Sequence, residues 1–530
     1  MPLILALALA LSCQEKPQET VSALADATSL KAEQVDPASV KFTWSDNAEG
    51  EKGYRVFIRQ ETDSYNVDPL ETIAAESTEY IFENLTEGAV YDFGVQAIAE
   101  DFTLHSKVVY LNDYQVPVQE KPEVPAIDPQ TVPQVTKVTT SYAYIAVSYK
   151  VEKLSGSNPE HGVCFSSEGT PTVDDIKVPG PQLPANKEIL QVVPNAYLED
   201  GKEYQMSIFV KNGSEYRYSN PQTVSLDTQP EAVNLTWEKQ SHDINGVEVY
   251  KTTSQLNDRN FNAWYAIADP SVVDFRVLYP ETVGSKKTIA SQAEAAEGTQ
   301  VLINGAIYGN YNIGVIITEG KMTQQWHGDI EGCYWATDNQ LYQLTRPIIG
   351  VDKEGKANAC WVGVPQQGTF YYYDRPQPNV VGQAKYGKVT ATSPAPAIDW
   401  KPYYAISCGP MVLYDGKVCA DNTMVDDKHY YTNFECWDES GVYSAHPDRS
   451  AVGVTADGKI VLFICDGRID ASQGAYIKEL GPVMKSIGCV HAMNLDGGGS
   501  TGMWVNGAGM INYKDGSWRA VKSTLGFFSK

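Results

Sequence analysis

Two segments near the C-terminus combine acidic, basic and glycine residues at the ends of apolar runs. The first is Asp466-Gly467-Arg468, and the second is Asn494-Leu495-Asp496-Gly497-Gly498-Gly499-Ser500. Asp-Gly alone is typical of a turn, but three consecutive glycines cost chain entropy that a simple turn does not require. They leave no side chain beside Asp496, so backbone N–H groups can approach the oxygen of an anion or a sugar. We therefore predict a ligand site here.

The elements that must position these segments are two strands and a helix. Residues 451–456 and 459–465 flank Asp457-Gly458, which predicts a tight hairpin. A helix is expected from Ser472 as its N-cap to Gly488, because apolar residues recur at helical spacing between them. The apolar run 489–495 then predicts a buried strand.

Strand, helix and strand in this order form a β-α-β unit. Its two strands should lie parallel in one sheet with a right-handed crossover, so their C-terminal ends share an edge. Asp466-Gly467-Arg468 and the segment 494–500 should therefore emerge side by side. Open sheets with crossover helices bind ligands at such an edge.

Several further motifs accompany these two segments. They are His446-Pro447-Asp448-Arg449-Ser450-Ala451-Val452-Gly453, Leu302-Ile303-Asn304-Gly305, Ile406-Ser407-Cys408-Gly409-Pro410, Asp415-Gly416-Lys417 and Arg519-Ala520-Val521. Together with segment 494–500, they give residues 235–530 a resemblance to the catalytic domain of the phosphodiester glycosidases. This resemblance implies an α+β domain with a β-rich mixed sheet. It also implies a hydrolase that cleaves the glycosidic bond of sugar-1-phosphodiesters, with α-N-acetylglucosaminyl as one candidate sugar.

The chemistry implied by the resemblance follows from the bond that is cut. Cleavage between the anomeric carbon and oxygen releases a phosphate monoester, which needs little protonation. We therefore assign Arg449, Arg468 and Arg519 to the phosphate, because planar guanidinium groups bind it through paired donors. Asp466 and Asp496 are candidates for base, nucleophile or stabiliser of an oxocarbenium-like centre, and the sequence leaves these roles open.

Other residues complete the predicted site. Glu479, about two turns into the expected helix, either orients Arg468 or is a solvated surface residue. Asn304 and Asn494 either bind sugar hydroxyls or satisfy backbone groups at strand ends. The remaining substrate-binding candidates are Gly497, Gly498, Gly499, Ser500 and Thr501.

Two alternative functions are compatible with the same segments. Asp466, Asp496 and Glu479 are possible ligands of a divalent cation in a metal-dependent phosphodiesterase, although the chain lacks a D-x-D-x-D-G loop. Otherwise no cofactor is expected. The second alternative is an inactive carbohydrate-binding surface protein. In each case the expected partner is a carbohydrate. If the protein is an enzyme, this carbohydrate is a sugar phosphodiester.

The rest of the chain predicts a multidomain protein, because 530 residues exceed what one hydrophobic core supports. Residues 28–118 and 134–228 alternate short apolar runs with polar turns and resemble fibronectin type III sandwiches, with Tyr91 and Tyr204 at the tyrosine-corner position. We interpret both as spacers rather than carbohydrate-binding modules. The Pro-rich segment 119–133 predicts a linker, and residues 229–530 form the expected catalytic domain.

The N-terminal segment 1–27 predicts export. An apolar run ends at Ala10-Leu11-Ser12-Cys13, which resembles a bacterial lipobox with Cys13 as the lipidated residue. We expect an outer-membrane or cell-surface lipoprotein, on the periplasmic or extracellular face, held to the membrane through a lipid alone. Simple secretion is the alternative.

Net charge and cysteine spacing argue against a nucleic-acid partner and a zinc site. A net charge of −25 disfavours nucleic acid as a partner, because nucleic-acid binding depends on clustered Lys and Arg. The 9 cysteines show no C-x-x-C pair or zinc spacing, which makes a zinc site improbable. Several lie within apolar runs, so buried free thiols are at least as probable as disulfides.

Overall fold

The structure is a computed structural model. It describes residues 23–60, 69–99, 104–118, 133–151, 160–183, 188–212, 215–279, 285–309, 312–324, 340–366, 368–512 and 518–530. The chain divides into two compact units, Met1–Val124 and Pro125–Lys530. Cys13 and nearly all of the predicted linker lie outside the described residues. Within the described part, no helix has the length and apolarity needed to cross a membrane.

The first unit contains a two-sheet β-sandwich, as its alternating sequence predicts. Inward-facing residues of β2 are buried at every second position, which is the period of a half-buried strand. The Tyr91 hydroxyl accepts a hydrogen bond from Thr86 N at 3.1 Å, so the predicted tyrosine corner is confirmed. One sheet has the order β1 (Thr28–Asp36), β2 (Ser39–Ser45), β5 (Glu79–Phe82) and the other β4 (Glu71–Ala74), β3 (Gly53–Gln60), β6 (Val90–Ile98), β7 (Val109–Gln115).

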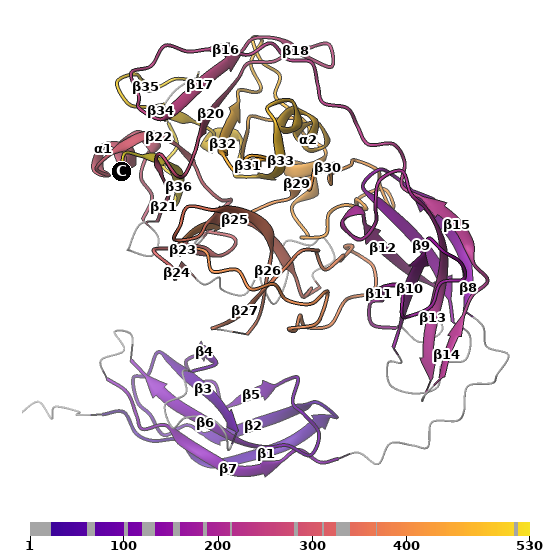
Figure 1. The fold of residues 1–530 in the computed structure, drawn as a ribbon. Coiled ribbons are helices and arrows are strands. Elements are labelled where there is room, and N and C mark those ends of the chain that lie inside the picture. Colours follow the sequence, from indigo (N-terminus) through magenta and orange to yellow (C-terminus); the bar gives the residue numbers. More distant parts are fainter. Residues whose placement is uncertain are drawn as a thin grey trace, which may run out of the picture. The chain divides into compact units, whose positions relative to one another are not determined.

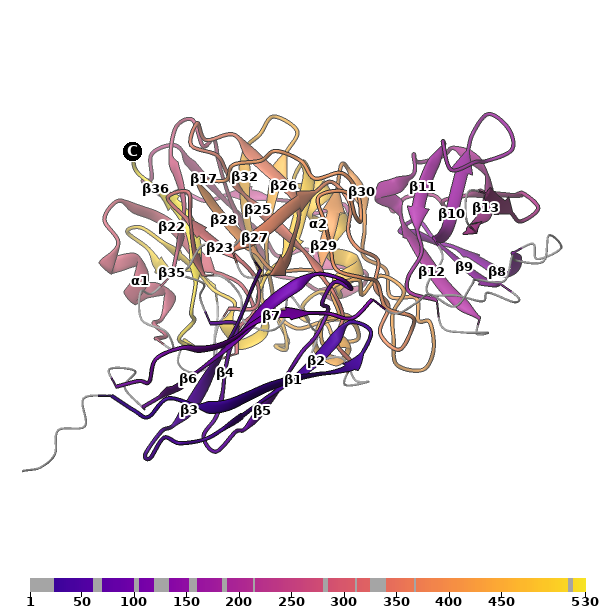
Figure 2. The ribbon, with the colours of Figure 1, turned by 90° about the horizontal axis from the view of Figure 1, so that it is seen from below.

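The second unit begins with another sandwich, whose two sheets are separate in Figure 2. Tyr204 repeats the corner geometry, because its hydroxyl accepts from Glu199 N at 3.1 Å. One sheet has the order β12 (Ile189–Pro194), β9 (Tyr144–Lys150), β8 (Gln134–Thr140). The other contains β11 (Ile176–Pro179), β10 (His161–Ser166), β13 (Glu203–Asn212), β14 (Glu215–Tyr218) and β15 (Gln222–Ser225), and the short 3-10 helix η1 spans Asn195–Tyr197.

This second sandwich packs directly on the C-terminal domain. The rings of Tyr144 and Tyr431 stack with their centroids 4.7 Å apart inside a buried apolar cluster. Around that cluster, Asn195 Nδ2 donates to the Val418 carbonyl at 2.8 Å, and Ser141 Oγ donates to Asp421 at 2.6 Å. A spacer that only separated domains would not need such a buried contact.

The C-terminal domain is built from three large sheets (Figure 1). The eight-stranded sheet has the order β16 (Glu238–Lys239), β17 (Val247–Thr252), β20 (Ala263–Ala268), β32 (Ile460–Cys465), β31 (Arg449–Thr455), β33 (Cys489–Asn494), β29 (Met411–Tyr414), β30 (Lys417–Val418). The five-stranded sheet has the order β21 (Asp274–Leu278), β36 (Thr524–Phe528), β22 (Thr299–Asn304), β34 (Met503–Val505), β35 (Gly509–Met510). The six-stranded sheet has the order β24 (Lys321–Gln324), β23 (Ile316–Thr318), β28 (Tyr404–Ser407), β25 (Thr345–Val351), β26 (Ala357–Gln366), β27 (Thr369–Tyr373). The remaining elements are the hairpin β18 (Gln255–Leu256) and β19 (Arg259–Asn260), helices α1 (Ile289–Ala295) and α2 (Ile477–Ser486), the π-helix η2 (Glu439–Tyr443) and the 3-10 helix η3 (Gly498–Ser500). The predicted multidomain, β-rich architecture is confirmed.

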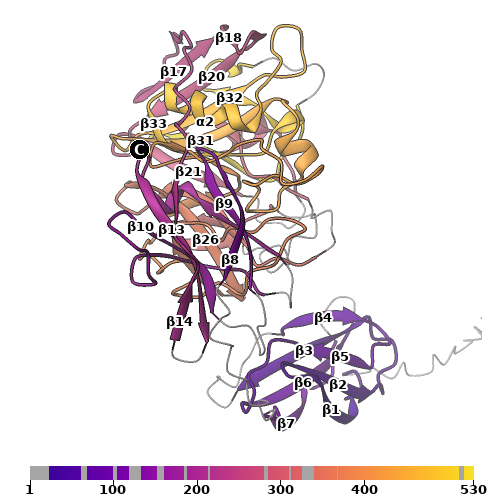
Figure 3. The ribbon, with the colours of Figure 1, turned by 90° about the vertical axis from the view of Figure 1, so that its right-hand side faces the viewer.

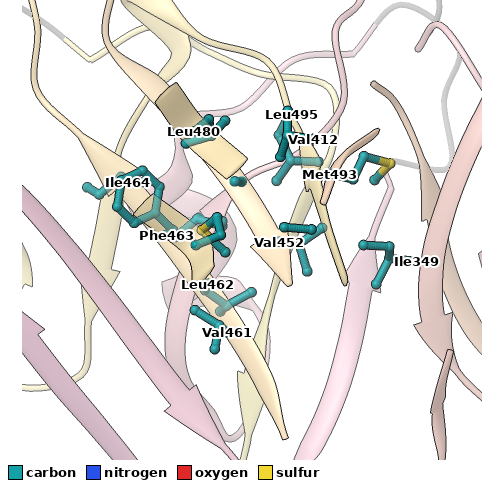
Figure 4. Close-up of a cluster of buried hydrophobic side chains, with 14 of the residues drawn as sticks. Ile349, Val412, Val452, Val461, Leu462, Phe463, Ile464, Leu480, Met493 and Leu495 are labelled. Carbon is teal, nitrogen blue, oxygen red and sulfur yellow. The ribbon is translucent and has the colours of Figure 1, made fainter. Parts of the chain in front are cut away.

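Strands β31 and β32 form the core of the eight-stranded sheet and are buried along their whole length. Figure 4 shows their apolar side chains, including those of Val452 and Phe463, packed with Leu480 of α2 and with Met493 of β33. Burial on both faces explains why these strands read as continuous apolar runs rather than as alternating ones. This core fixes the strand ends from which the candidate site is built.

The predicted β-α-β unit is present, with one correction. The Asp457-Gly458 hairpin joins β31 to β32 as predicted, with Gly458 at a φ of +83°. Strands β32 and β33 both pair antiparallel with β31, so they are parallel to each other in one sheet. However, β31 lies between them, and the two strands are therefore not neighbours as expected.

The helix of this unit starts later than predicted. Helix α2 spans Ile477–Ser486 and packs on β29 and β33 (Figure 3). Its N-cap is Tyr476, where the Glu479 side chain accepts from the Tyr476 backbone N–H at 2.8 Å. Ser472 is not the cap, because its hydroxyl donates to the Asp466 carbonyl at 2.7 Å. Gly488 follows the helix at a φ of +96°, as the C-terminal signal predicted.

The cysteines behave as buried thiols in the part of the chain that the structure describes. Seven of them are free, namely Cys164, Cys360, Cys408, Cys419, Cys436, Cys465 and Cys489, and all except the half-buried Cys419 are fully buried. Cys333 and Cys13 lie outside the described residues.

Candidate active site

Three chain segments meet at one end of the eight-stranded sheet. Asp448 directly precedes β31, Asp466 follows β32, and Asp496 follows β33. The strand register sets them at the same level, because Arg449 pairs with Cys465 and Ala451 pairs with Asn494. Two strand spacings separate the backbones of β32 and β33, which is about 10 Å. The predicted meeting of the two carboxylate segments at one sheet edge is therefore present, with Asp448 between them.

The three glycines after Asp496 are required by close contacts. A Cβ at Gly497 would lie 2.7 Å from the Asp448 carbonyl oxygen, and a Cβ at Gly499 would lie 2.6 Å from a guanidinium nitrogen of Arg519. Gly498 has a φ of +59°, and a Cβ there would lie 3.3 Å from Arg468 NH2. The glycines thus make room for a neighbouring strand end and for two arginines.

Most backbone N–H groups of this loop donate hydrogen bonds within the protein, and among the described contacts only Gly499 N has no acceptor. Gly497 N donates to Asp496 Oδ1 at 2.9 Å, and Gly498 N donates to the Asp448 carbonyl at 2.9 Å. Ser500 N and Thr501 N close the 3-10 turn by donating to the carbonyls of Gly497 and Gly498. The donors left for a ligand here are therefore the guanidinium groups and Gly499 N rather than the whole run of backbone amides.

Arg468 lies beside the glycine loop and is held in a defined orientation. Its Nε and NH2 both donate to Asp448 Oδ2, at 3.0 and 2.8 Å. The Arg468 side chain is 59% exposed, whereas that of Asp448 is 5% exposed. Arg468 also has a φ of +60°, a conformation that is strained for a residue with a side chain. This combination of strain, fixed orientation and exposure is typical of a binding residue.

Arg519 lies on the other side of the same loop. It is exposed, and its NH1 donates to Ser500 Oγ at 3.5 Å. Ser500 is buried and also hydrogen bonds to the Asp496 carboxyl group. Asp496, Ser500 and Arg519 therefore form a connected group, with Arg468 against the neighbouring glycine.

The Asp496 carboxyl group has a strongly perturbed environment. Burial raises its pKa to about 6, and this effect outweighs the hydrogen bonds from Ser500 and Gly497 N and the positive charge of Arg519, which lower it. A carboxyl group whose pKa lies near neutrality while cations flank it is a candidate for acid-base or nucleophilic chemistry.

Asp466 occupies a more enclosed position. Its side chain is 1% exposed, and Oδ1 accepts a hydrogen bond from Asn512 Nδ2 at 3.1 Å. Its backbone is also fixed on both sides, because Asp466 N donates to Asn262 O at 3.0 Å and its carbonyl accepts from Ser472 Oγ. This placement favours a supporting role for Asp466 and leaves Asp496 as the accessible carboxylate.

The assignment of Arg449 to a phosphate requires correction. Its Nε donates to the Ala475 carbonyl at 3.0 Å, and NH2 donates to the carbonyls of Val442 and Ala445 at 2.7 and 2.9 Å. The residue is 2% exposed, and burial lowers the pKa of its guanidinium group to about 10. Because its donors are used by backbone carbonyls inside the protein, we reassign Arg449 to holding the segments around β31.

Glu479 matches neither of its two predicted roles. It is 6% exposed, so it is not a solvated surface residue. Its carboxylate caps helix α2 and accepts from Arg259 NH2 and Asn257 Nδ2, both at 2.6 Å, rather than orienting Arg468. Glu479 therefore anchors the helix to the β18–β19 hairpin.

Both predicted asparagines satisfy backbone groups. Asn304 Nδ2 donates to the Asp496 carbonyl at 2.6 Å, and Asn304 Oδ1 accepts from Ser450 Oγ at 2.7 Å. Asn494 Nδ2 donates to the Gly409 carbonyl at 2.9 Å. Asn304 thereby positions Asp496 from behind. Thr501 is fully buried, and its hydroxyl has no hydrogen-bond partner in the described structure.

Tyr308 is a site residue that the sequence analysis did not single out. Its hydroxyl donates to the Ala520 carbonyl at 2.9 Å, and both Ser500 and Arg519 hydrogen bond to it. Lys286 Nζ lies 4.8 Å from the centre of its ring. A half-exposed aromatic ring beside Asp496 offers an apolar face of the kind that sugars pack against. The sequence feature that could have identified Tyr308 is its position shortly after the Asn304-Gly305 motif.

A buried polar pair was also missed. Arg346, at the start of β25, is 3% exposed, and its Nε and NH1 have no hydrogen-bond partner in the described structure. Glu435 is 2% exposed, and burial raises its pKa to about 7 against the opposing charge of Arg346. The charges of Arg346 and Asp496 act on the pKa of the buried Cys408 thiol in opposite directions, Arg346 lowering it and Asp496 raising it.

The structure does not group the three carboxylates proposed as metal ligands. Within the described residues, Asp466, Glu479 and Asp496 form no cluster of ligand atoms, and Glu479 is occupied by Arg259. A separate surface cavity of about 500 Å³ is lined by α1, Trp504 and Asn506 and includes none of the predicted site residues.

Sequence comparison shows which family profiles parts of the chain match. Residues 297–528 match the profile of the family described as phosphodiester glycosidase, and residues 25–111 match that of the fibronectin type III domain. The C-terminal domain is therefore phosphodiester glycosidase-like. The predicted resemblance is confirmed, and it supports a glycosidase-type function in general terms.

Individual relatives are distant or partial. The chain is 37% identical over 100 residues to the SPbeta prophage-derived uncharacterized protein YomE of Bacillus subtilis, a match that covers 19% of this chain and 15% of that protein. The catalytic domain of zebrafish N-acetylglucosamine-1-phosphodiester alpha-N-acetylglucosaminidase, auto-inhibited by its pro-peptide, is 18% identical, with a TM-score of 0.36 over 57% of this chain and 91% of that chain. A hypothetical protein from Synechocystis is 13% identical, with a TM-score of 0.35 over 86% of this chain and 98% of that chain.

Proposed function

We propose that the phosphodiester glycosidase-like domain hydrolyses the glycosidic bond of a sugar-1-phosphodiester in an extracellular or cell-envelope glycan. The observation that carries this proposal is the pair of guanidinium groups, Arg468 and Arg519, packed against the glycines that follow Asp496. Guanidinium groups bind phosphate oxygens through paired, charge-assisted hydrogen bonds. A neutral glycoside would not need two cations beside its reactive carboxylate.

In the proposed reaction, the bond between the anomeric carbon and the bridging oxygen breaks. The bridging oxygen leaves as part of a phosphate monoester, and water supplies the hydroxyl group that replaces it, with its second proton released to solvent or to a base. Arg468 and Arg519 stabilise the negative charge that develops on the leaving group. Because this leaving group is already acidic, the reaction does not need a strong general acid.

Asp496 acts in its ionised form, either as the nucleophile or as the base that activates water. Asn304 and Gly497 N hold it from the backbone side, and Ser500 and Arg519 favour its charged state. Asp466 acts as a positioning residue through Asn512. This division follows from the enclosure of Asp466 and the greater accessibility of Asp496.

The decisive experiment compares Arg519→Gln with wild type on two substrates of the same sugar. One is a sugar-1-phosphodiester, with α-N-acetylglucosamine tested first, and the other is a neutral aryl glycoside. Loss of charge-assisted hydrogen bonds should lower kcat/KM on the diester by about 10- to 100-fold. At about pH 8 or above, where Asp496 with a pKa of about 6 stays ionised even without Arg519, the aryl glycoside should change by less than about threefold, because no phosphate is present.

The matched control is Arg276→Gln, which removes an arginine that pairs with Asp274 on β21. It should leave both substrates unaffected. Equal losses on the diester and the aryl glycoside in Arg519→Gln would show that Arg519 does not bind phosphate, and would overturn the proposal. Parallel assays with and without EDTA test the metal-dependent alternative, in which only the chelated sample loses activity.

A further inference from the structure

Three carboxylates converge at one end of the first sandwich, in a part of the chain unrelated to the proposed active site. Asp46 follows β2, Glu51 precedes β3, and Glu76 follows β4. One carboxylate oxygen from each lies within 4.8 Å of the others. Among the described residues, no Lys or Arg forms an ion pair with any of the three. Like charges at this separation repel one another unless a cation or protons neutralise them.

Glu51 provides a second and independent observation. It is only 7% exposed, yet its carboxylate has no hydrogen-bond or ion-pair partner in the described structure. A carboxylate on a nearly buried residue is normally paired with a cation or coordinates a metal. Its oxygen lies within the 4.8 Å cluster and therefore faces the other two carboxylates.

The surroundings of Asp46 and Tyr54 show the same uncompensated negative charge. Asp46 accepts hydrogen bonds from Ala48 N at 2.9 Å and from the Tyr54 hydroxyl. Neither donor carries a positive charge, so within the described residues the negative charge of this cluster has no ion-pair partner.

We propose that Asp46, Glu51 and Glu76 form a Ca²⁺ site in the first sandwich. Calcium takes six to eight oxygen ligands in flexible geometry, which suits three carboxylates from two loops completed by water or main-chain oxygens. Magnesium instead demands near-ideal octahedral geometry and keeps most of its water. Glu76 is exposed, so the ion can enter from solvent. By joining the ends of β2, β3 and β4, the ion ties both sheets of the sandwich together.

The first test is terbium luminescence of the full chain. Tb³⁺ substitutes for Ca²⁺ and emits when nearby aromatic rings transfer energy to it. Tyr54 touches the site through Asp46, and the Trp44 ring lies 5.5 Å from the Tyr54 ring. We expect Tb³⁺ emission on aromatic excitation that added Ca²⁺ abolishes, with a dissociation constant of about 0.1 to 1 mM for Ca²⁺, as for other extracellular modules.

Glu51→Gln and Glu49→Gln form a matched pair of variants. Both remove one negative charge from the same loop, but Glu49 is exposed and lies outside the cluster. Glu51→Gln should lose at least about tenfold in Ca²⁺ affinity, whereas Glu49→Gln should bind like wild type. Equal affinities in the two variants, or no Ca²⁺-sensitive emission in wild type, would overturn the proposal.

Thermal unfolding gives a readout that does not depend on terbium. At ten times the dissociation constant, Ca²⁺ should raise the unfolding temperature of the first sandwich by about 5 to 10 °C in wild type and in Glu49→Gln. In chelator, Glu51→Gln should unfold at a higher temperature than wild type, because it relieves repulsion, and the same Ca²⁺ concentration should then raise its unfolding temperature by no more than about 3 °C. A Ca²⁺ response in Glu51→Gln as large as in wild type, or a Mg²⁺ response as large as that to Ca²⁺, would contradict the assignment.

Discussion

Replacing Ser500 with alanine isolates the feature that tunes Asp496. Three contacts lower the pKa of this carboxyl group against burial, and the Ser500 hydroxyl is the first among them. The substitution removes one oxygen atom and leaves Arg519 and the Gly497 N–H in place. If the reaction needs ionised Asp496, the variant should require a higher pH for the same activity.

The size of the effect follows from the hydrogen bond that is lost. A hydrogen bond to a charged group contributes about 1.5 to 3 kcal/mol, which corresponds to a pKa change of about 1 to 2 units. The wild-type enzyme should lose kcat/KM below the Asp496 pKa of about 6. In Ser500→Ala, the midpoint of this acid limb should move to about pH 7 or 8. Well below both midpoints the variant should be about 10- to 100-fold slower, while at high pH the two enzymes should converge.

The assay is the pH dependence of kcat/KM for a sugar-1-phosphodiester between pH 4 and 9. Ser486→Ala is the matched control, because its hydroxyl donates to the Val483 carbonyl at 2.7 Å at the end of α2, away from Asp496. It should keep the wild-type midpoint. An unshifted midpoint in Ser500→Ala, or an equal loss at every pH, would refute the coupling between Ser500 and Asp496.

Three further predictions concern stability and domain packing. Arg449→Met should lower the free energy of unfolding in urea by about 3 kcal/mol or more, because it leaves buried carbonyls unpaired. The activity of the folded variant should fall equally on the diester and the aryl substrate. Burial raises the pKa of Glu435 from 4.5 to about 7, so its contribution to stability is complete below pH 4.5 and is lost as pH rises through 7. In wild type, the free energy of unfolding should therefore fall by about 3 kcal/mol between these two pH values. Urea unfolding at several pH values should show that Glu435→Gln abolishes this fall. Tyr144→Ala removes the stack on Tyr431 and should release the second sandwich as a separately unfolding unit in calorimetry, whereas wild type unfolds the two together.

The strongest local signals in the sequence predicted local structure correctly. Asp457-Gly458 specified the hairpin, and the tyrosine corners at Tyr91 and Tyr204 identified both sandwiches, since each depends on contacts within about five residues. The glycine run after Asp496 also marked the right place. The sequence did not indicate that the glycines also make room for arginine side chains from distant segments.

The order of strands in the sheet could not be derived from these local patterns. The hairpin of β31 and β32 leaves open which of its two strands β33 pairs with. The sequence therefore does not indicate that β31 separates β32 from β33. The roles of arginines depend on the same information. Arg449 and Arg468 each stand beside a strand end, but only the fold shows that one donates inward to carbonyls and the other faces solvent.

The position of β31 explains why the two phosphate-binding candidates differ. It brings Asp448 between the two strand ends, and Asp448 fixes Arg468 through two hydrogen bonds while neutralising part of its charge. Arg519 comes from outside the eight-stranded sheet, near the C-terminus, and its contact with Ser500 is long, at 3.5 Å. Arg468 therefore provides a prepositioned surface with little net charge, and Arg519 supplies most of the attraction for an anion. Because Arg519 also lowers the pKa of Asp496, the residue proposed to attract the phosphate would also favour the ionised form of the carboxylate proposed to react.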